Sequence, residues 1–347
     1  MGFVWFWIVA VMLAAYVVLD GFDLGVGILY PFLARTEEDR RVMIRSIGPV
    51  WDGNEVWLIA GGGTLFFAFP LLYASAFSGF YLPLMIVLWL LIMRGASIEL
   101  RMHMENHVWR AFFDGLFFVS SALLAIFFGA ALANVDRGVP LGDDNYFFLP
   151  LWTNWQVGPQ PGILDWYTVI GGLVAFISLS IHGALYMVMK ASDDLENSSR
   201  AFVRFLWPGL VIITIASLIG TIVARPRSLL NYESHAFLFL IPLVVLASLA
   251  GIRVFTQKLQ PFNAFLSSCL YLVMMLVGAA AGLYPTVLPS STDAAHDMTI
   301  AKSLAGPHGL RVGLVWWGIG MLLALLYFVT TYRMFRGKVS DDSGYGH

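Results

Sequence analysis

The stretch that decides the fold is WDGNEVWLIAGGGTLFFAFP, residues 51–70. Its beginning is polar, its later part is apolar, and three consecutive glycines and Pro70 interrupt it. Later loops alternate between the two sides of the membrane, and whether this segment crosses decides which side each of them lies on. The positions of the lysines and arginines decide between the two topologies, since these residues concentrate in cytoplasmic loops.

The composition around this stretch is that of an integral membrane protein. Hydrophobic residues make up 59% of the 347 residues and charged residues 12%, whereas soluble domains carry about 25% charged residues. Long apolar runs between short charged clusters predict an all-α polytopic membrane protein and lack the alternation of a transmembrane β-barrel. The sequence predicts about nine transmembrane helices, at residues 3–30, 51–73, 76–98, 112–134, 166–189, 203–224, 235–255, 262–288 and 311–335.

The loop charges favour a crossing by residues 51–73. With nine spans, one side holds 15 of the 20 lysines and arginines; without this crossing the split is 9 against 11. We therefore expect the N-terminus outside and the tail RGKVSDDSGYGH, residues 336–347, in the cytoplasm. The whole chain, 1–347, is predicted to be a single integral membrane domain, with a first half (1–134), an exterior loop (135–165) and a second half (166–347).

Some classes of function and segment are not expected. The net charge of −2 and the absence of a basic strip predict no nucleic-acid partner. Cys269 is the single cysteine, so the sequence offers no disulfide framework and no cysteine-rich metal motif. The first apolar run lacks a basic start, so we expect no cleavable signal peptide. We predict no metal site.

Two carboxylates stand inside the first predicted span, in LDGFDLGVGILY, residues 19–30. Asp20 and Asp23 are three residues apart and so share one helix face, while Gly21 and Gly25 form a small-xxx-small pair that admits a neighbouring helix. An ionised group in the membrane is costly and by default marks function. Proton uptake and release is one interpretation, and structural pairing with a basic residue is the other.

A second acidic pair, Asp52 and Glu55, opens the second predicted span. Asp52 as the N-cap with Glu55 three residues later resembles a capping box, and the helix dipole favours both charges. The same position, at the cytoplasmic surface and near Asp23, suits proton uptake. The two roles can coexist.

The residues of segment 93–101 and His182 each have more than one interpretation. Arg94, in MRGASIELR (93–101), is the expected counter-ion for an aspartate of the first two helices, whereas Glu99 and Arg101 are expected on a solvated face. His182 is the one histidine well inside a span. It is a weak candidate for haem ligation, and a hydrogen bond within the helix bundle is the favoured interpretation.

Three of these segments together resemble subunit II of cytochrome bd-type quinol oxidases: DGFDLGVG, RRVMIRSIGPVWDGNEVWLIAGGGTLFFAFPLLYASAFSGFY and MRGASIELR. The resemblance implies a subunit of a terminal respiratory oxidase that oxidises quinol and reduces dioxygen to water, in a bacterial inner membrane. It implies two four-helix bundles plus one peripheral helix. It also implies a haem-bearing subunit I as partner, with haems b and d, and one or two small single-helix subunits.

The resemblance also assigns roles to residues. The acidic proton-path position of the family falls on Asp52 and its buried aspartate of the first helix on Asp23, with Asp20 beside it. Trp51, Gly53 and Asn54 match the surrounding motif. No catalytic residue is expected in this chain, which would support assembly and a cytoplasmic proton path. The resemblance allows a bound quinone among the membrane lipids, although no motif shows one.

Two other functions are alternatives. A secondary transporter would use intramembrane acids for ion coupling, but it predicts matching broken helices and acids in both halves, and the second half has no comparable carboxylate. A purely structural scaffold for a haem subunit would place the same acids in packing roles only.

Overall fold

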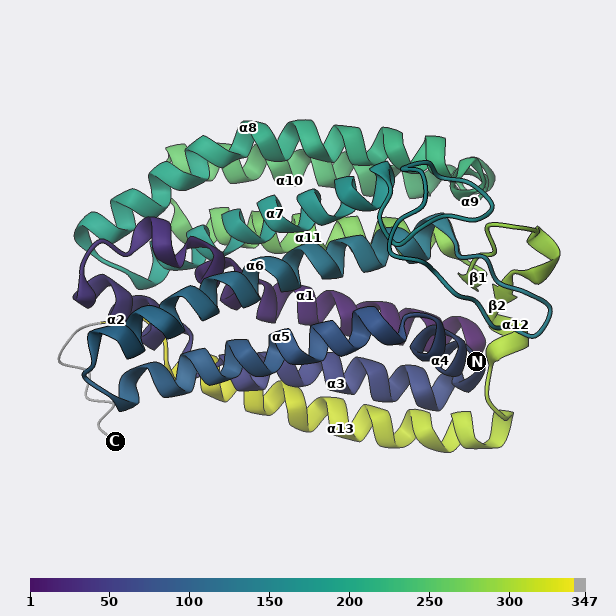
Figure 1. Cartoon of the computed structure of the whole chain (residues 1–347), viewed down its shortest axis with the longest axis horizontal. Helices are drawn as coiled ribbons and strands as arrows, with labels where there is room; N and C mark the ends of the chain where they lie inside the picture. The colour runs from purple at the N-terminus through teal and green to yellow at the C-terminus, as the bar shows by residue number, and fades with distance from the viewer. Residues whose placement is uncertain (340–347) are drawn as a thin grey trace.

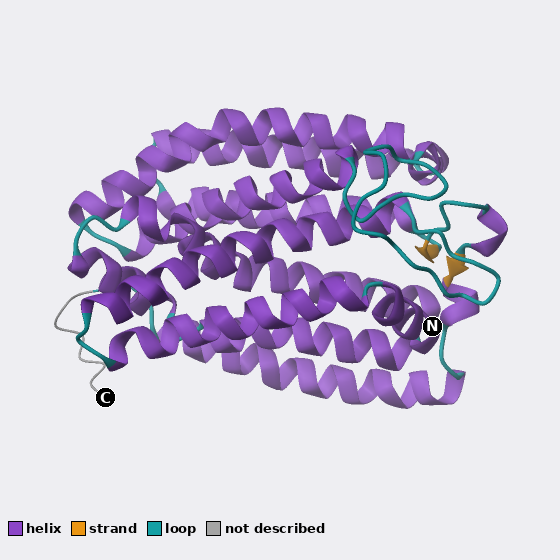
Figure 2. Cartoon of the chain, viewed as in Figure 1, coloured by secondary structure: helices purple, strands orange, loops and turns teal. Residues whose placement is uncertain are grey.

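The structure, a computed structural model, describes residues 1–339, and Figures 1 and 2 show an almost entirely helical molecule. Its long helices are α1 (Gly2–Leu33), α3 (Trp51–Ala68), α5 (Tyr81–Leu100), α6 (His107–Arg137), α7 (Trp166–Lys190), α8 (Asp193–Ala224), α10 (Leu240–Gln257), α11 (Pro261–Leu283) and α13 (Pro307–Met334). The short helices are α2 (Glu37–Ile47), α4 (Pro70–Gly79), η1 (Arg101–His103), η2 (Pro226–Leu229), α9 (Leu230–Ser234), η3 (Ala236–Phe239), η4 (Ala294–His296) and α12 (Ile300–Ser303). Most of the tail predicted to be cytoplasmic, residues 340–347, lies outside the described residues.

Within residues 1–339, eight helices are long and apolar enough to cross a membrane, and α3 runs lengthwise beside them (Figure 1). The hydropathy of α3 is lower because its first turn is polar and its middle holds three glycines. The prediction of about nine membrane helices is thus confirmed. Three predicted spans differ most from the helices: 51–73 breaks at Phe69, where Pro70 begins α4; 203–224 begins ten residues earlier, at Asp193; and 262–288 ends at Leu283.

The two ends of the helix bundle differ in charge. One end, called the arginine-rich end here, carries α2 and η1, with Arg40, Arg41, Arg45 and Arg101. The other end carries the N-terminus and is called the N-terminal end. Residues 138–165 cover this second end together with the antiparallel strands β1 (Thr286–Leu288) and β2 (Met298–Thr299) (Figure 2).

The long helices form the two four-helix bundles that the family resemblance implied. The first contains α1, α3, α5 and α6, and the second contains α7, α8, α10 and α11. The peripheral helix is α13, which lies outside the first bundle next to α3 (Figure 1). The rings of Trp57 on α3 and Phe328 on α13 are 5.6 Å apart, and Trp317 on α13 donates to Met12 Sδ on α1.

Glycines hold the two bundles together. Helices α1 and α7 cross where Gly25 meets Gly183: a Cβ on Gly25 would lie 2.8 Å from Gly183 Cα. On the other side of α7, a Cβ on Gly171 would lie 2.8 Å from the carbonyl oxygen of Gly129 on α6. Only small residues permit such approach. Helix α7 therefore packs tightly against both α1 and α6, which fixes the polar face of α1 inside the first bundle.

Candidate functional site

The acids of α1 point into the first bundle and are sealed from solvent. Asp20 is 0% exposed and Asp23 is 1% exposed. Tyr16 lies one turn before Asp20 on the same helix, and its buried hydroxyl makes no hydrogen bond within the described residues. The three side chains are spaced i, i+4 and i+7 and so form one polar stripe along an otherwise apolar helix.

Asp20 is locked in a buried ion pair. Arg94 of α5 donates from Nη1 and Nη2 to the two carboxylate oxygens of Asp20, at 2.8 and 2.6 Å. Arg94 Nη2 also donates to Glu55 Oε2 of α3 at 3.0 Å. A bidentate pair is the strongest form of a carboxylate–guanidinium contact. Arg94 is thus the counter-ion that the sequence predicted, and it binds two acids from two helices.

Asp23 has no such cation. Its Oδ2 accepts a hydrogen bond from Asn54 Nδ2 of α3 at 2.8 Å, whereas its Oδ1 is buried and has no hydrogen-bond partner among the described residues. Asn54 Nδ2 also lies 3.2 Å from the carbonyl oxygen of Leu19. Tyr332 of α13 donates to Asn54 Oδ1 at 2.9 Å. The Asn54 amide therefore binds Asp23 and is itself positioned by the Tyr332 hydroxyl, while one carboxylate oxygen of Asp23 has no partner.

The charges in this cluster do not cancel. Asp20 and Glu55 share the guanidinium of Arg94, whereas Asp23 has no ion pair within the described residues. Burying an unpaired ionised carboxylate is expensive, and a buried group without a counter-ion escapes that cost by taking up a proton. Asp23 has this environment, while the side chain of Glu55 is 21% exposed and reaches the edge of the bundle. The arrangement can hold one mobile proton between a locked ion pair and an unpaired acid.

The structure separates the remaining predicted residues from this cluster. Asp52 lies exposed in the first turn of α3, and the predicted capping box is wrong, because the N-cap is Val50 and no side chain caps the helix. Trp51 packs its ring over Gly95, and Gly53 lies against the Tyr327 side chain of α13. The helix begins two residues earlier than a cap at Asp52 would require, so Asp52 is a first-turn residue and is exposed.

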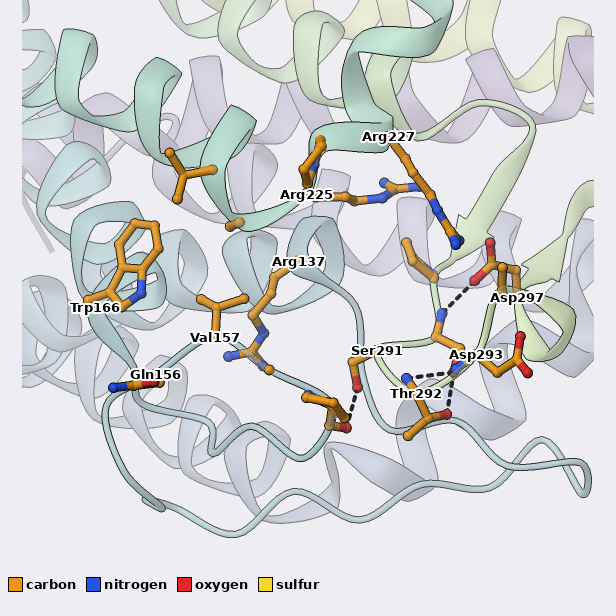
Figure 3. A pocket seen from close by; sticks show the side chains of 18 residues that line it. Arg137, Gln156, Val157, Trp166, Arg225, Arg227, Ser291, Thr292, Asp293 and Asp297 are labelled. Atoms are coloured by element: carbon orange, nitrogen blue, oxygen red, sulfur yellow. Dashed lines mark hydrogen bonds between the residues drawn. The ribbon is translucent and has the colours of Figure 1, made fainter.

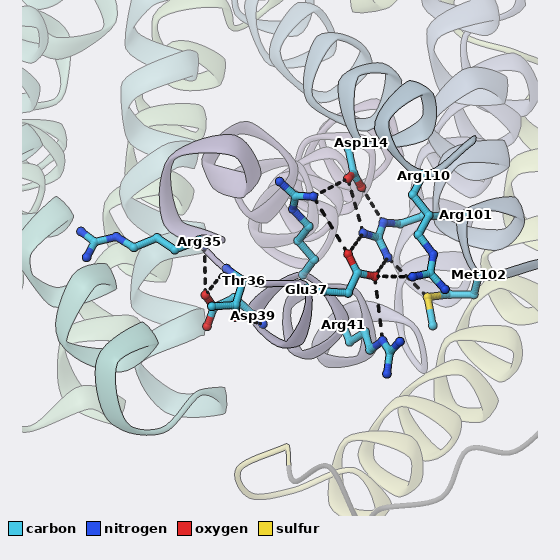
Figure 4. A network of polar contacts seen from close by, with 10 residues as sticks. Arg35, Thr36, Glu37, Asp39, Arg41, Arg101, Met102, Arg110 and Asp114 are labelled. Atoms are coloured by element: carbon cyan, nitrogen blue, oxygen red, sulfur yellow. Dashed lines mark hydrogen bonds and ion pairs between the residues drawn. The ribbon is translucent and has the colours of Figure 1, made fainter. Parts of the chain in front are cut away.

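Arg101 corrects a second prediction. Glu99 is exposed as expected, but Arg101 is 1% exposed and not part of a solvated face. Its guanidinium donates to Glu37 at 3.1 and 3.0 Å and to Asp114 Oδ1 at 2.5 Å (Figure 4). The carboxylates come from α2 and α6, which close over the end of α5. The ion pairs with Glu37 and Asp114 offset the free-energy cost of burying the Arg101 guanidinium.

Glu37 is the centre of this second network, at the arginine-rich end. Arg40, Arg41 and Arg110 also lie within 4.0 Å of its carboxylate (Figure 4). The hydrogen bond from Arg101 holds the pKa of Glu37 below its usual value. Thr36 and Asp39 form a capping box that starts α2 and so positions Glu37.

His182 does not offer a free ligand nitrogen. Its Nδ1 is 2.7 Å from Ser268 Oγ and its Nε2 is 2.9 Å from the carbonyl oxygen of Val18. The ring also stacks on Phe265 at 4.7 Å. Haem ligation would require one of these hydrogen bonds to break, so the environment of His182 does not fit a haem ligand. The interpretation as a histidine hydrogen-bonded within the bundle agrees with this geometry.

Sequence reasoning missed Tyr332, Glu37 and Asp114. No sequence pattern points to Tyr332. The helix α13 is apolar all round, so its sequence does not show which of its faces meets α3. Glu37 and Asp114 lie among other charges, and only the fold shows that both surround Arg101.

Comparison with known proteins agrees with this architecture. The sequence model described as cytochrome bd terminal oxidase subunit II matches residues 1–335. Cytochrome bd-I ubiquinol oxidase subunit 2 of Escherichia coli is 30% identical over 98% of this chain and 95% of that protein. Cytochrome bd ubiquinol oxidase subunit 2 of Bacillus subtilis is 30% identical over 97% of this chain and 96% of that protein.

A solved structure shows the same fold. A chain of the bd oxidase from Geobacillus thermodenitrificans superimposes with a TM-score of 0.76 at 17% sequence identity, covering 96% of this chain and 98% of that chain. The family model and the two relatives extend over nearly all of the sequence, and the multi-pass helical architecture fits them. The chain therefore belongs to the cytochrome bd terminal oxidase subunit II family.

Proposed function

We propose that this chain, as subunit II of a quinol oxidase in a bacterial inner membrane, supplies the proton path from the cytoplasm for reduction of dioxygen to water. The observation that carries the proposal is Asp23: a fully buried acid with an unpartnered carboxylate oxygen, beside an acid that an arginine already neutralises. Such a group can bind and release a proton without exposing a bare charge for long.

The neighbouring acids have different roles in this proposal. Asp52, exposed in the first turn of α3, collects protons at the surface, and Glu55 connects the surface to the buried cluster because it is half-buried and bonded to Arg94. Asp20 stays paired with Arg94 and sets a fixed local charge. The arginine-rich end faces the cytoplasm by the same charge rule that predicts an exterior N-terminus.

The redox chemistry belongs to the partner in this proposal. Haems b and d would be held by a haem-bearing subunit I, since His182 uses both ring nitrogens in hydrogen bonds. These groups supply electron transfer to dioxygen when bound. One or two small single-helix subunits, a quinone and membrane lipids complete the proposed surroundings. This chain supports assembly of the haem-bearing subunit and holds protons, and none of its side chains is assigned a catalytic role.

The test compares two substitutions on the same helix. In the purified complex, Asp23→Asn keeps the size of the side chain and an oxygen for Asn54, so the haem absorption should stay near the wild-type level while oxygen consumption falls about tenfold or more. Asp20→Asn leaves Arg94 without its bidentate partner, so the complex itself should be lost. Asp144→Asn, in an exposed loop at the N-terminal end, is the control and should change neither property.

The outcomes separate the rival functions. Loss of haem in Asp23→Asn would support a purely structural scaffold and contradict a proton path. Unchanged oxygen consumption with intact haem would contradict it as well. A secondary transporter would require a matching acid in the second half, and the residue of α7 that contacts α1 at Val18 is His182.

A further inference from the structure

A polar pocket lies at the N-terminal end, and none of the residues that line it belongs to the Asp23 cluster (Figure 3). Its volume is about 690 Å³, within the usual range for small-molecule sites. Loop residues 156–159, the end of α8, η2 and residues 289–297 form its walls. It lies where the helices end, which is the depth of lipid headgroups in a membrane.

Three arginines line this pocket, and they differ in how far other groups use them. Arg137 is fully engaged: its nitrogens donate to the carbonyl oxygens of Gly138 and Gly162, to Asn134 Oδ1 at 2.6 Å and to Asp165. It is therefore part of the wall and not a free cation.

Arg225 and Arg227 supply the available positive charge. Arg225 makes one long contact, 3.5 Å from Nη1 to the carbonyl oxygen of Asp136, with the Asp136 carboxylate 3.9 Å away. The side chain of Arg227 is exposed and makes no hydrogen bond or ion pair within the described residues; its backbone carbonyl accepts from the Leu230 amide. Figure 3 shows the Arg227 side chain extending across the pocket toward Asp297 and Asp293. Arg225 and Arg227 are two positions apart in the chain and both line the pocket. Guanidinium groups are well suited to binding a phosphate group.

The opposite wall carries negative charge. Asp297 Oδ1 accepts from the Ser290 amide at 2.8 Å, and Asp293 Oδ1 accepts from the Ala295 amide at 2.9 Å, which leaves one oxygen of each carboxylate available. A ligand with negative charge alone would be repelled by these acids. A ligand with a phosphate at one end and an ammonium at the other matches both walls.

The lower wall of the pocket continues as apolar helix surface. Val223 lines the pocket, and Ile219 and Ile222 of α8 are exposed directly below it. Trp166 stands at the same level, as aromatic residues do at membrane interfaces. A charged pocket next to an exposed apolar helix surface fits a lipid, which has a charged headgroup and apolar chains, better than a free phosphate ion.

We propose that this pocket binds the headgroup of a phospholipid that carries an amine, with its phosphate on Arg225 and Arg227 and its ammonium on Asp293 and Asp297. The acyl chains then lie along the exposed face of α8. This site tethers the end of α8 and residues 289–297 to the membrane surface, and it is independent of the proposed proton path.

The test is lipid retention by the purified oxidase complex, measured by native mass spectrometry during titration with phosphatidylethanolamine. Wild type should retain one more molecule than Arg227→Gln, whose affinity for that lipid should be about tenfold lower. Arg311→Gln, an exposed arginine at the same end on α13, is the matched control and should bind as wild type does. Asp293→Asn, which keeps the oxygen that caps Ala295, should lower retention of phosphatidylethanolamine specifically.

Two further titrations distinguish the ligand source. Phosphatidylglycerol should bind more weakly than phosphatidylethanolamine, and inorganic phosphate should not displace the lipid. Displacement by phosphate would overturn the lipid assignment, and equal binding of phosphatidylglycerol would overturn the role of the aspartates. Identical retention by wild type and Arg227→Gln would overturn the site itself. Oxygen consumption in Arg227→Gln should stay near wild type whether or not Asp23 carries protons.

Discussion

Two arginine-centred clusters in the first half of the chain are built from the same residue types and differ in their charge balance. At the arginine-rich end, two acids are surrounded by four arginines: Glu37 and Asp114 with Arg40, Arg41, Arg101 and Arg110. Inside the membrane the acids outnumber the cation: Asp20 and Glu55 pair with Arg94, and Asp23 beside them accepts only from Asn54. The first cluster has no acid without a cation, whereas the second has one.

This difference distinguishes a cluster that fixes helix ends together from a cluster that could exchange a proton. A cluster whose acids are all paired fixes the ends of α2, α5 and α6 together, because each charge has a partner in place. A cluster with one acid too many cannot keep every group ionised in a low-dielectric environment. In the function proposed above, the surplus acid, Asp23, is the group that exchanges a proton. Four substitutions test this contrast.

The largest effect is expected from Arg94→Leu. It leaves Asp20 buried without a cation and removes the partner of Glu55, so folding should be destabilised by about 3–5 kcal/mol and the complex should assemble poorly. The measurement is the yield of haem-containing complex after purification. The double variant Arg94→Leu/Asp20→Leu removes both charges and should recover much of the yield. Failure of the second change to restore assembly would show that the ion pair is not the reason.

Arg101→Gln should cost less, about 2–3 kcal/mol, because it removes charge-assisted hydrogen bonds to Glu37 and Asp114. Both carboxylates retain other arginines nearby, Arg40 and Arg110. We expect a lower unfolding temperature of the complex with unchanged oxygen consumption per haem. A selective loss of turnover would contradict the holding role of this cluster.

Glu37→Gln should change the dependence of stability on pH. The pKa of Glu37 is lowered in the folded chain, so its contribution is complete above the unfolded value of about 4.3 and is lost as pH falls through the lower folded value. Since its side chain is 36% exposed, the contribution is small, about 1 kcal/mol.

The check is thermal unfolding of wild type and Glu37→Gln at several pH values. Wild type should be more stable at pH 6, and the difference should shrink below about pH 4.3. Glu38→Gln, the exposed neighbour on α2, is the control. A difference that grows as the solution is acidified would have the wrong sign for a paired carboxylate.

Tyr332→Phe should also give only a small change in stability, about 0.5–1.5 kcal/mol, since one hydrogen bond to Asn54 is lost. Because Asn54 bonds Asp23, we also expect slower oxygen consumption than in Tyr327→Phe, which removes a hydroxyl from the same helix without touching that amide. Equal turnover in the two variants would show that α13 has no influence on the Asp23 site.

The sequence alone predicts much of this picture, and the misses have physical causes. Apolar length and loop charge are properties of single segments, so the helices and the partnership of Arg94 with α1 could be predicted. The burial of Arg101 could not, because it depends on α2 and α6 closing over one helix end. The N-cap at Val50 was missed because a polar first turn resembles a capping box whichever residue begins the helix.

The hydrogen bonds of Asp23 could not be predicted from the sequence either. Its environment is set by Asn54 on α3, and that amide in turn by Tyr332 nearly 280 residues away along the chain. Hydrogen-bond partners between distant helices follow from the rotation of each helix about its axis, and an apolar helix such as α13 gives no pattern from which that rotation can be predicted.

The most direct test of the central claim is proton uptake by the Asp23→Asn complex during a single reaction of the fully reduced enzyme with dioxygen, followed with a pH-sensitive dye. We expect uptake from the medium to slow by about tenfold or more while the haem content is unchanged. Uptake at the wild-type rate, with the substitution confirmed and the complex intact, would contradict a proton-carrying role of Asp23.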